Sequence, residues 1–181
     1  PNLDLRTKSL ELEGRVSAPT LTENESIYSA LKLGLFDYVT KNNFKKVLIG
    51  ISGGIDSALT AAICVDALGS ENVIGVAMPS KYNSDESLDD AKALSKNLNM
   101  ELKVIEIEPL VEIFRNTLSS TVVDKLSQVT DENIQSRVRG NILMGLSNQT
   151  GAMVVSTGNK SEMAVGYSTL YGDLAGGYAL L

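Results

Sequence analysis

Four short apolar runs, separated by longer segments of mixed polarity, dominate the pattern of the chain. They cover Val47–Ile51, Val73–Met78, Leu102–Ile107 and Ala152–Ser156. Runs of this length that are rich in valine and isoleucine are typical of strands. Because these runs are apolar throughout rather than alternating, they predict strands of a parallel sheet that helices cover on both faces.

The segments around these runs carry apolar residues at helical spacing. The first predicted helix extends from about Glu23 to Lys41, and residues 22–25 fit a capping box at its start. A second helix ends at about Leu68. Ser84 and Thr130 are the expected N-caps of helices that end near Asn97 and Asn148. A further helix begins with Pro109 in its first turn, and its apolar face consists of Leu110, Ile113, Phe114 and Leu118.

Strands that alternate with helices predict an α/β fold, a doubly wound parallel sheet with helices on both faces. Ligands of such sheets bind at the carboxyl ends of the strands, where the strand order reverses. We therefore expect the first and fourth strands to be neighbours, which brings residues 52–57 close to residues 157–162. Residues 1–20 have no clear period and are expected to be a linker-like segment. The glycine-rich tail, 166–181, is expected to be irregular.

A glycine- and serine-rich loop, G-I-S-G-G-I-D-S over residues 50–57, follows the first strand. Gly53 and Gly54 allow a close approach of the backbone to a ligand. The N–H groups at the start of the next helix favour an anion. The loop lacks the lysine of a Walker A motif and contains Asp56 instead, a carboxylate that suits a phosphate site if it holds Mg²⁺. The alternative is a helix start that binds nothing.

Composition excludes several classes of function. The 181 residues are enough for one domain with a sizeable core. A formal charge of −6 and a pI near 4.7 argue against a nucleic-acid partner. The chain has no histidine, which excludes Ser-His-Asp and Cys-His catalysis. Its one cysteine, Cys64, is expected to be buried. No apolar run reaches membrane-spanning length and no signal peptide is evident, so we expect a cytoplasmic protein without a membrane partner.

Polar side chains gather on the predicted helix over 131–148. Asn133 and Arg137 lie one turn apart on one face, and Gln135 and Arg139 share another. For an isolated helix such residues most often form a solvated face. Arg139 is interpreted in that way and left out of the predicted site.

Taken together, the motifs of the chain resemble those of NAD⁺ synthetases. The loop over 50–57 is similar to the pyrophosphate loop of ATP pyrophosphatases. It is followed in order by M-P-S at 78–80, E-N-I-Q-S-R-V-R at 132–139, S-T-G-N-K-S-E at 156–162 and G-Y-S-T-L-Y-G-D at 166–173. The resemblance covers nearly all of residues 20–181. It implies a synthetase domain over 21–181 of the type found in the glutamine-dependent branch, in which a glutaminase domain lies upstream.

The resemblance implies a two-step reaction. ATP adenylates the nicotinate carboxylate of deamido-NAD⁺ and releases pyrophosphate, and ammonia then displaces AMP to form the amide. It also implies a homodimer. By resemblance, ATP binds Gly50, Ser52, Gly53, Gly54, Asp56, Ser57, Met78 and Thr157; Mg²⁺ binds Asp56 and Glu162; deamido-NAD⁺ binds Asn133, Arg137 and Glu162; and the catalytic residues are Asp56 and, at the ammonia end, Asp173.

Simpler interpretations of single residues stay open at this point. Thr157 is also a suitable helix cap, and Glu162 is also a suitable first-turn acid. Tyr167 and Tyr171 also fit ordinary packing. The family's catalytic lysine loop follows the Gly-Asp segment, whereas the chain ends at Leu181, so we expect a C-terminal truncation.

Two other classes of protein compete with the main interpretation. One is a different AMP-forming ligase with the same loop, such as GMP synthetase or a tRNA-modifying enzyme. The acidic charge disfavours tRNA, and the segments over 133–137 and 157–162 disfavour GMP synthetase. The other is a nucleotide-binding module that binds ATP without releasing pyrophosphate.

Overall fold

The computed structural model describes residues 20–81, 85–121 and 126–181. Its centre is one sheet of five parallel strands in the order β3-β2-β1-β4-β5. The strands are β1 (Val47–Ile51), β2 (Val73–Ala77), β3 (Glu101–Val104), β4 (Met153–Ser156) and β5 (Tyr178–Ala179). Because β1 pairs with β2 on one side and with β4 on the other, the strand order reverses at β1, as the sequence predicted.

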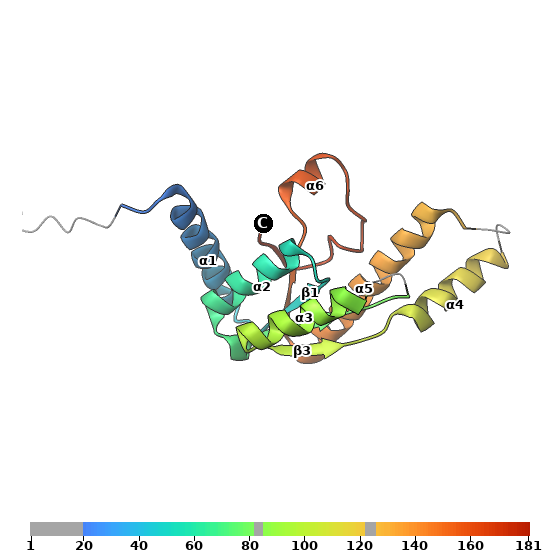
Figure 1. Cartoon of the computed structure of the whole chain (residues 1–181), viewed down its shortest axis with the longest axis horizontal. Coiled ribbons are helices and arrows are strands. Elements are labelled where there is room, and N and C mark those ends of the chain that lie inside the picture. Colours follow the sequence, from blue (N-terminus) through green and yellow to red (C-terminus); the bar gives the residue numbers. More distant parts are fainter. Residues whose placement is uncertain (1–19, 82–84, 122–125) are drawn as a thin grey trace, which may run out of the picture.

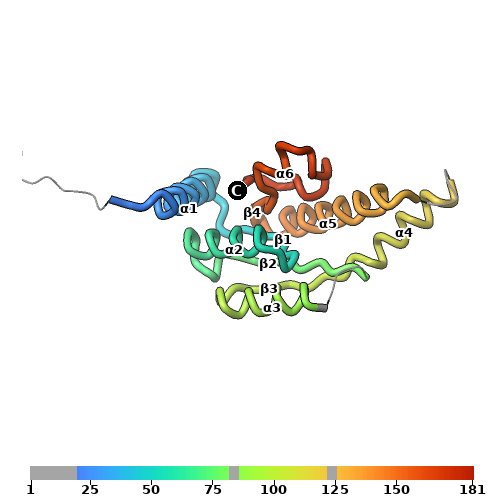
Figure 2. The backbone as a smooth tube through the Cα atoms, turned by 45° about the horizontal axis from the view of Figure 1, so that its top comes forward, coloured from blue at the N-terminus to red at the C-terminus, as the bar shows by residue number. Residues whose placement is uncertain are grey.

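Helices cover both faces of this sheet. They are α1 (Glu23–Lys41), α2 (Ile55–Leu68), α3 (Asp85–Leu98), α4 (Glu108–Ser119), α5 (Gln128–Thr150) and α6 (Lys160–Ala164), with a 3₁₀ turn at Ser70–Asn72. Buried residues of α1, α2 and α3 share one core with the sheet, and those of α4 and α5 share the other. In both views α4 and α5 lie side by side and extend beyond the sheet (Figures 1 and 2).

Successive side chains of each strand point to opposite faces of the sheet and so contribute to the two cores in turn. In β1, Val47, Ile49 and Ile51 enter the core under α1 and α2, whereas Leu48 enters the core under α5. β4 divides in the same way, with Val155 on the first face and Val154 on the second. Strands that are apolar throughout therefore reflect burial on both faces, which confirms the predicted α/β class.

Several predicted boundaries differ from the structure. The third strand is Glu101–Val104 rather than 102–107, and Ile107 is the N-cap residue of α4. The long helix begins at Gln128, and its N-cap is Ser127 instead of Thr130. The prediction of an irregular tail was wrong where Tyr178 and Ala179 pair with β4 as a fifth strand. The expected cap Ser84 and almost all of the linker-like segment 1–20 lie outside the described residues.

The apolar face predicted for α4 divides between core and surface. Val111 is fully buried and Leu118 packs against the core, whereas Leu110, Ile113 and Phe114 are exposed. Cys64 is buried in α2, as predicted, and burial raises the pKa of its thiol to about 12. No helix in the described ranges combines the length and apolar character needed to cross a bilayer.

Candidate functional site

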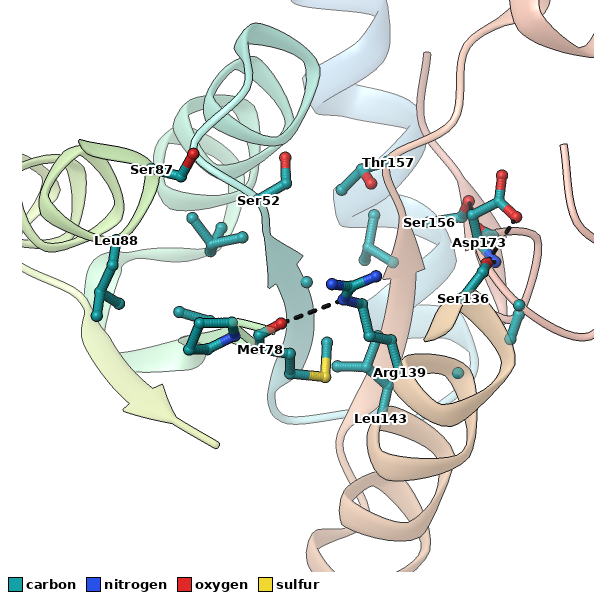
Figure 3. A pocket seen from close by; sticks show the side chains of 18 residues that line it. Ser52, Met78, Ser87, Leu88, Ser136, Arg139, Leu143, Ser156, Thr157 and Asp173 are labelled. Atoms are coloured by element: carbon teal, nitrogen blue, oxygen red, sulfur yellow. Dashed lines mark hydrogen bonds between the residues drawn. The ribbon is translucent and has the colours of Figure 1, made fainter. Parts of the chain in front are cut away.

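A cavity of about 290 Å³ lies at the carboxyl ends of β1, β2 and β4. Its walls come from the end of β1 and the loop after it, from Met78 and Pro79, from the start of α3, from α5, and from two segments that follow β4. Figure 3 shows Ser52 and Thr157 at one end of the cavity and Met78 and Leu143 at the other. This is where an open parallel sheet holds its ligands, at the reversal of strand order.

The loop after β1 is organised by its two serines. The Ser57 hydroxyl donates to the Gly54 carbonyl oxygen at 2.9 Å and lies 3.2 Å from the Ser52 hydroxyl oxygen. The Gly54 N–H donates to the Ser52 hydroxyl oxygen at 3.2 Å. Gly54 precedes α2 and offers no side-chain cap, so the first turn of α2 retains the N–H groups and dipole that favour an anion.

Gly53 is required by both conformation and space. Its φ is +84°, in the region that glycine adopts most easily. A Cβ atom at this position would lie 2.6 Å from the Ser87 carbonyl oxygen at the start of α3. The loop therefore fits closely against α3, and Gly53 cannot be replaced without moving one of the two.

Arg139 corrects the sequence-based interpretation, which placed it on a solvated face. The side chain is half-buried and lines the cavity, and its Nε donates to the Met78 carbonyl oxygen at 3.2 Å. Figure 3 shows the guanidinium group between Met78 and Thr157. Burial lowers the pKa of Arg139. A desolvated positive charge in a cavity is a strong anion-binding element, and periodicity alone could not distinguish it from a surface arginine.

Five residues predicted for the site line the cavity, and three of them lie outside β1 and the loop after it: Met78, Thr157 and Asp173. Thr157 is not a helix cap, because α6 begins with Asn159 as its N-cap. Gly50 and Ser52 also line the cavity, whereas Gly53, Gly54 and Ser57 form the loop behind it. The nucleotide half of the predicted site is thus assembled from segments that are far apart in the sequence.

Asp56 and Glu162 are connected through Asn159. The Asn159 amide Nδ2 donates to Asp56 Oδ2 at 3.4 Å, and the Asn159 backbone N–H donates to Glu162 Oε2 at 3.3 Å. Glu162 is the acidic residue of a capping box in the first turn of α6. The simpler interpretation of Glu162 as a first-turn acid therefore describes its local structure correctly. Neither carboxylate is among the residues that line the cavity, although both are half-buried, Asp56 in the first turn of α2 and Glu162 in the first turn of α6.

The donor set at this point fits Mg²⁺ rather than zinc. Within the described ranges, no three acidic or cysteine side chains gather as a ready-made cation cage. Magnesium, however, is usually held by one or two carboxylates together with substrate phosphates and water. Two half-buried carboxylates next to an anion-binding loop match that pattern.

Asn133 and Arg137 form hydrogen bonds with a later segment of the same chain, residues 169–170. Asn133 Oδ1 accepts from the Thr169 hydroxyl at 2.8 Å, and Arg137 Nε donates to the Leu170 carbonyl oxygen at 3.2 Å. The face of α5 predicted to approach deamido-NAD⁺ therefore holds residues 169–173 in place. Sequence reasoning missed Ser136 on this same face, which contacts Asp173.

Fold and site together define an α/β protein with a cavity at the reversal of strand order, beside a loop of the pyrophosphate type. The family model for NAD synthase matches residues 27–181, and the chain belongs to this family. It is 51% identical over 98% of its length to the glutamine-dependent NAD⁺ synthetase of Thermotoga maritima, of which the match covers 31%.

Solved structures agree with this assignment. The glutamine-dependent NAD⁺ synthetase of Acinetobacter baumannii, in complex with ADP, has a TM-score of 0.89 and 47% identity over 91% of this chain and 31% of its own. The NH₃-dependent NAD synthetase of Campylobacter jejuni has a TM-score of 0.81 and 33% identity over 88% of this chain and 67% of its own. The chain thus spans about a third of the length of the glutamine-dependent relatives it matches.

Proposed function

We propose that this chain is the synthetase domain of an NAD⁺ synthetase, with residues 21–181 forming the domain. ATP would adenylate the nicotinate carboxylate of deamido-NAD⁺ with release of pyrophosphate, and ammonia would then form the amide and release AMP. The observation that carries the proposal is one cavity lined both by the loop after β1 and by Asp173. Family membership and the ADP complex of the Acinetobacter baumannii relative support ATP as the co-substrate.

The residues around the cavity would bind different parts of the substrates. The N–H groups at the start of α2 and the two loop serines would hold the phosphates, and Arg139 would add a positive charge from α5. Thr157 and the backbone near Met78 border the space for the nucleotide. The segment 169–173, held on α5, would place Asp173 where ammonia arrives. Because these groups are fixed before substrate binds, little reorganisation is needed in the transition state.

We propose Asp56 and Glu162 as the residues that would hold Mg²⁺. The bound ion would offset negative charge on the phosphates as pyrophosphate leaves. Asn159 supports this assignment because it hydrogen-bonds both residues and keeps their carboxylates near one another. Titration of Mg²⁺ with the wild-type protein and with Glu162→Gln, read as ATP consumption, tests the proposal. An unchanged Mg²⁺ requirement in Glu162→Gln would remove Glu162 from the ion's ligands.

A homodimer and an upstream glutaminase domain are part of the same proposal, as is a cytoplasmic location. The exposed apolar side chains of Leu110, Ile113 and Phe114 on α4 support a contact between two copies. Sedimentation of the wild-type chain and of Ile113→Asp tests that contact: the variant should shift to the monomer.

The decisive assay measures conversion of ATP to AMP and pyrophosphate with and without deamido-NAD⁺, with ammonium present. We expect pyrophosphate release only when deamido-NAD⁺ is added, together with formation of NAD⁺. Pyrophosphate release with another carboxylate or carbonyl acceptor instead would indicate a different AMP-forming ligase. Binding of ATP without any release of pyrophosphate would indicate a non-catalytic module.

A further inference from the structure

Ser136 makes two hydrogen bonds to one residue of the site. Its hydroxyl donates to Asp173 Oδ1 at 3.1 Å and accepts from the Asp173 backbone N–H at 3.0 Å. A single side chain on α5 thereby fixes both the backbone and the carboxylate of Asp173. Ser136 and Asp173 both line the cavity, and Figure 3 shows them facing one another at its edge.

The remaining contacts of Asp173 leave one carboxylate oxygen open. The Thr169 N–H donates to Oδ1 at 2.7 Å, and the Ser156 hydroxyl donates to the Asp173 carbonyl oxygen at 3.1 Å. Within the described part of the chain, Oδ2 receives no hydrogen bond. Oδ1 is therefore the anchored oxygen, and Oδ2 is the one that can meet a ligand in the cavity.

The backbone around Asp173 is fitted closely to α5. A Cβ atom on Gly172 would lie 2.2 Å from the Ser136 hydroxyl oxygen, and a Cβ atom on Gly140 would lie 2.9 Å from the Gly172 carbonyl oxygen. Tyr171 has a φ of +64°, an uncommon conformation for a residue with a side chain. Ser136 is the member of this helix face that contacts the carboxylate itself.

We propose that Ser136 is a positioning residue that orients the carboxylate of Asp173 for the amidation step; this rests on the proposed function. In that step the ammonia nitrogen bonds to the acyl carbon of the adenylate, the bond from that carbon to the AMP oxygen breaks, and the nitrogen loses one proton. Oδ2 of Asp173 accepts a hydrogen bond from ammonia and takes up this proton. The rate of such a transfer depends on the orientation of the acceptor.

Ser136→Ala tests the proposal, with Ser147→Ala as the matched control on the same helix, remote from Asp173. Two rates are compared in the wild type and both variants: ammonium-dependent formation of NAD⁺, and exchange of labelled pyrophosphate into ATP with deamido-NAD⁺ but no ammonium. Loss of a hydrogen bond to a charged group should slow the ammonium-dependent rate of Ser136→Ala about 10-fold. Pyrophosphate exchange and the KM for ATP should stay within about twofold, and Ser147→Ala should match the wild type.

A double-mutant cycle with Asp173→Asn decides whether Ser136 acts through Asp173. We expect Ser136→Ala to cause no further loss in the Asp173→Asn background. A full additional loss there, or an equal fall in both rates of the single variant, would overturn the proposal in favour of a merely structural role.

A second variant covers the case in which Ser136→Ala misfolds, and the activity of the wild type separates a failure of the proposed function from a failure of the role of Ser136. Should Ser136→Ala not fold, Ser136→Cys fills the position with a much weaker donor and should show the same selective loss. If the wild type itself catalyses neither pyrophosphate exchange nor NAD⁺ formation, the proposed function has failed. If the wild type catalyses both and the Ser136 variants match it, only the role of Ser136 has failed.

Discussion

Single side chains set the electrostatics of the cavity. Asp56 is a negative charge within the loop that we propose to hold phosphates, and its proximity to them is unfavourable unless a cation lies between. Arg139 is a positive charge that the fold has partly removed from water. The two residues therefore have different expected roles, one with the metal and one with an anionic substrate, and each role has its own test.

Replacement of Asp56 should stop the first step without loss of the fold. We expect Asp56→Ala to lower the rate of pyrophosphate release by about 10²-fold or more, because one charge contact to the transition state is lost. The measurement is release of pyrophosphate with saturating deamido-NAD⁺, and circular dichroism confirms folding. Asp89→Ala, an exposed acid on α3, is the control. Wild-type turnover by a folded Asp56→Ala protein would exclude Asp56 from the mechanism.

Replacement of Arg139 should weaken the binding of an anionic substrate. Arg139→Met keeps much of the length and removes the charge, and we expect the KM for ATP or for deamido-NAD⁺ to rise about tenfold, which is the effect of about 1.4 kcal/mol. Steady-state kinetics with each substrate varied in turn shows which one Arg139 binds. Unchanged KM values for both would mean that its contact with the Met78 carbonyl is purely structural.

At the scale of the secondary-structure elements, the start of α5 explains how the site helix is held. Ser127 Oγ accepts from the Thr130 N–H at 3.2 Å, so Ser127 is the cap and Thr130 supplies the capped N–H group. We expect Ser127→Ala to lower the free energy of unfolding by about 1 kcal/mol and Thr130→Ala by clearly less. Urea denaturation of both variants measures the difference. A larger loss in Thr130→Ala would reverse the assignment.

An ion-pair cluster joins α4, α5 and the loop after β2. Arg115 contacts both carboxylate oxygens of Asp131 and donates to Glu108 Oε1 at 2.5 Å, and Lys81 Nζ lies 2.9 Å from that same Glu108 oxygen. Hydrogen bonds from Arg115 lower the pKa of Asp131 despite its burial. Burial alone would raise the pKa of Glu108, but hydrogen bonds from Lys81 and Arg115 outweigh it and lower that pKa.

These two lowered pKa values make a prediction about pH. Carboxylates with depressed folded-state pKa values stabilise the fold above their unfolded values near 4, and this stabilisation is lost as the pH falls through the folded values. We expect Arg115→Met to cost about 1–2 kcal/mol at neutral pH, between the ranges for exposed and buried pairs. The cost should shrink markedly near pH 3. Denaturation curves at both pH values measure it, and a cost independent of pH would mean that Arg115 acts through packing.

A prediction for the chain as a whole concerns which compound supplies the amide nitrogen of NAD⁺, ammonia or glutamine. The only thiol of the chain, Cys64, is buried in α2 with its pKa raised to about 12, so it cannot serve as the nucleophile of a glutaminase. We expect that glutamine alone will not support NAD⁺ formation by this chain, whereas ammonium will support it in a version completed through the family's lysine loop. Product formation with glutamine in ammonium-free buffer, compared with an equimolar ammonium control, checks this. Formation of NAD⁺ by this chain with glutamine alone would contradict the proposal that a separate, upstream glutaminase domain releases the ammonia.

The class of fold and the position of the main loop could be predicted from the amino-acid sequence alone. Short strands that are apolar throughout and alternate with helices favour a parallel sheet covered on both faces, and G-I-S-G-G-I-D-S directly follows one of them. The neighbouring positions of β1 and β4 were expected from the reversal of strand order in doubly wound sheets and were confirmed. The sequence T-E-N-E at residues 22–25 also predicted the capping box at Thr22, because a capping box depends only on local hydrogen bonds, and the structure contains it.

The polar residues of α5 that belong to the cavity could be identified only from the packing of the folded chain. Helical periodicity places Asn133, Arg137 and Arg139 on faces, but it cannot show what lies opposite each face. The return of the chain to pair β5 with β4 places the segment 169–173 against Asn133, Ser136 and Arg137, while Arg139 is turned towards Met78. Burial of a charge depends on contacts between segments that are distant in the sequence, so no pattern within one helix predicts it.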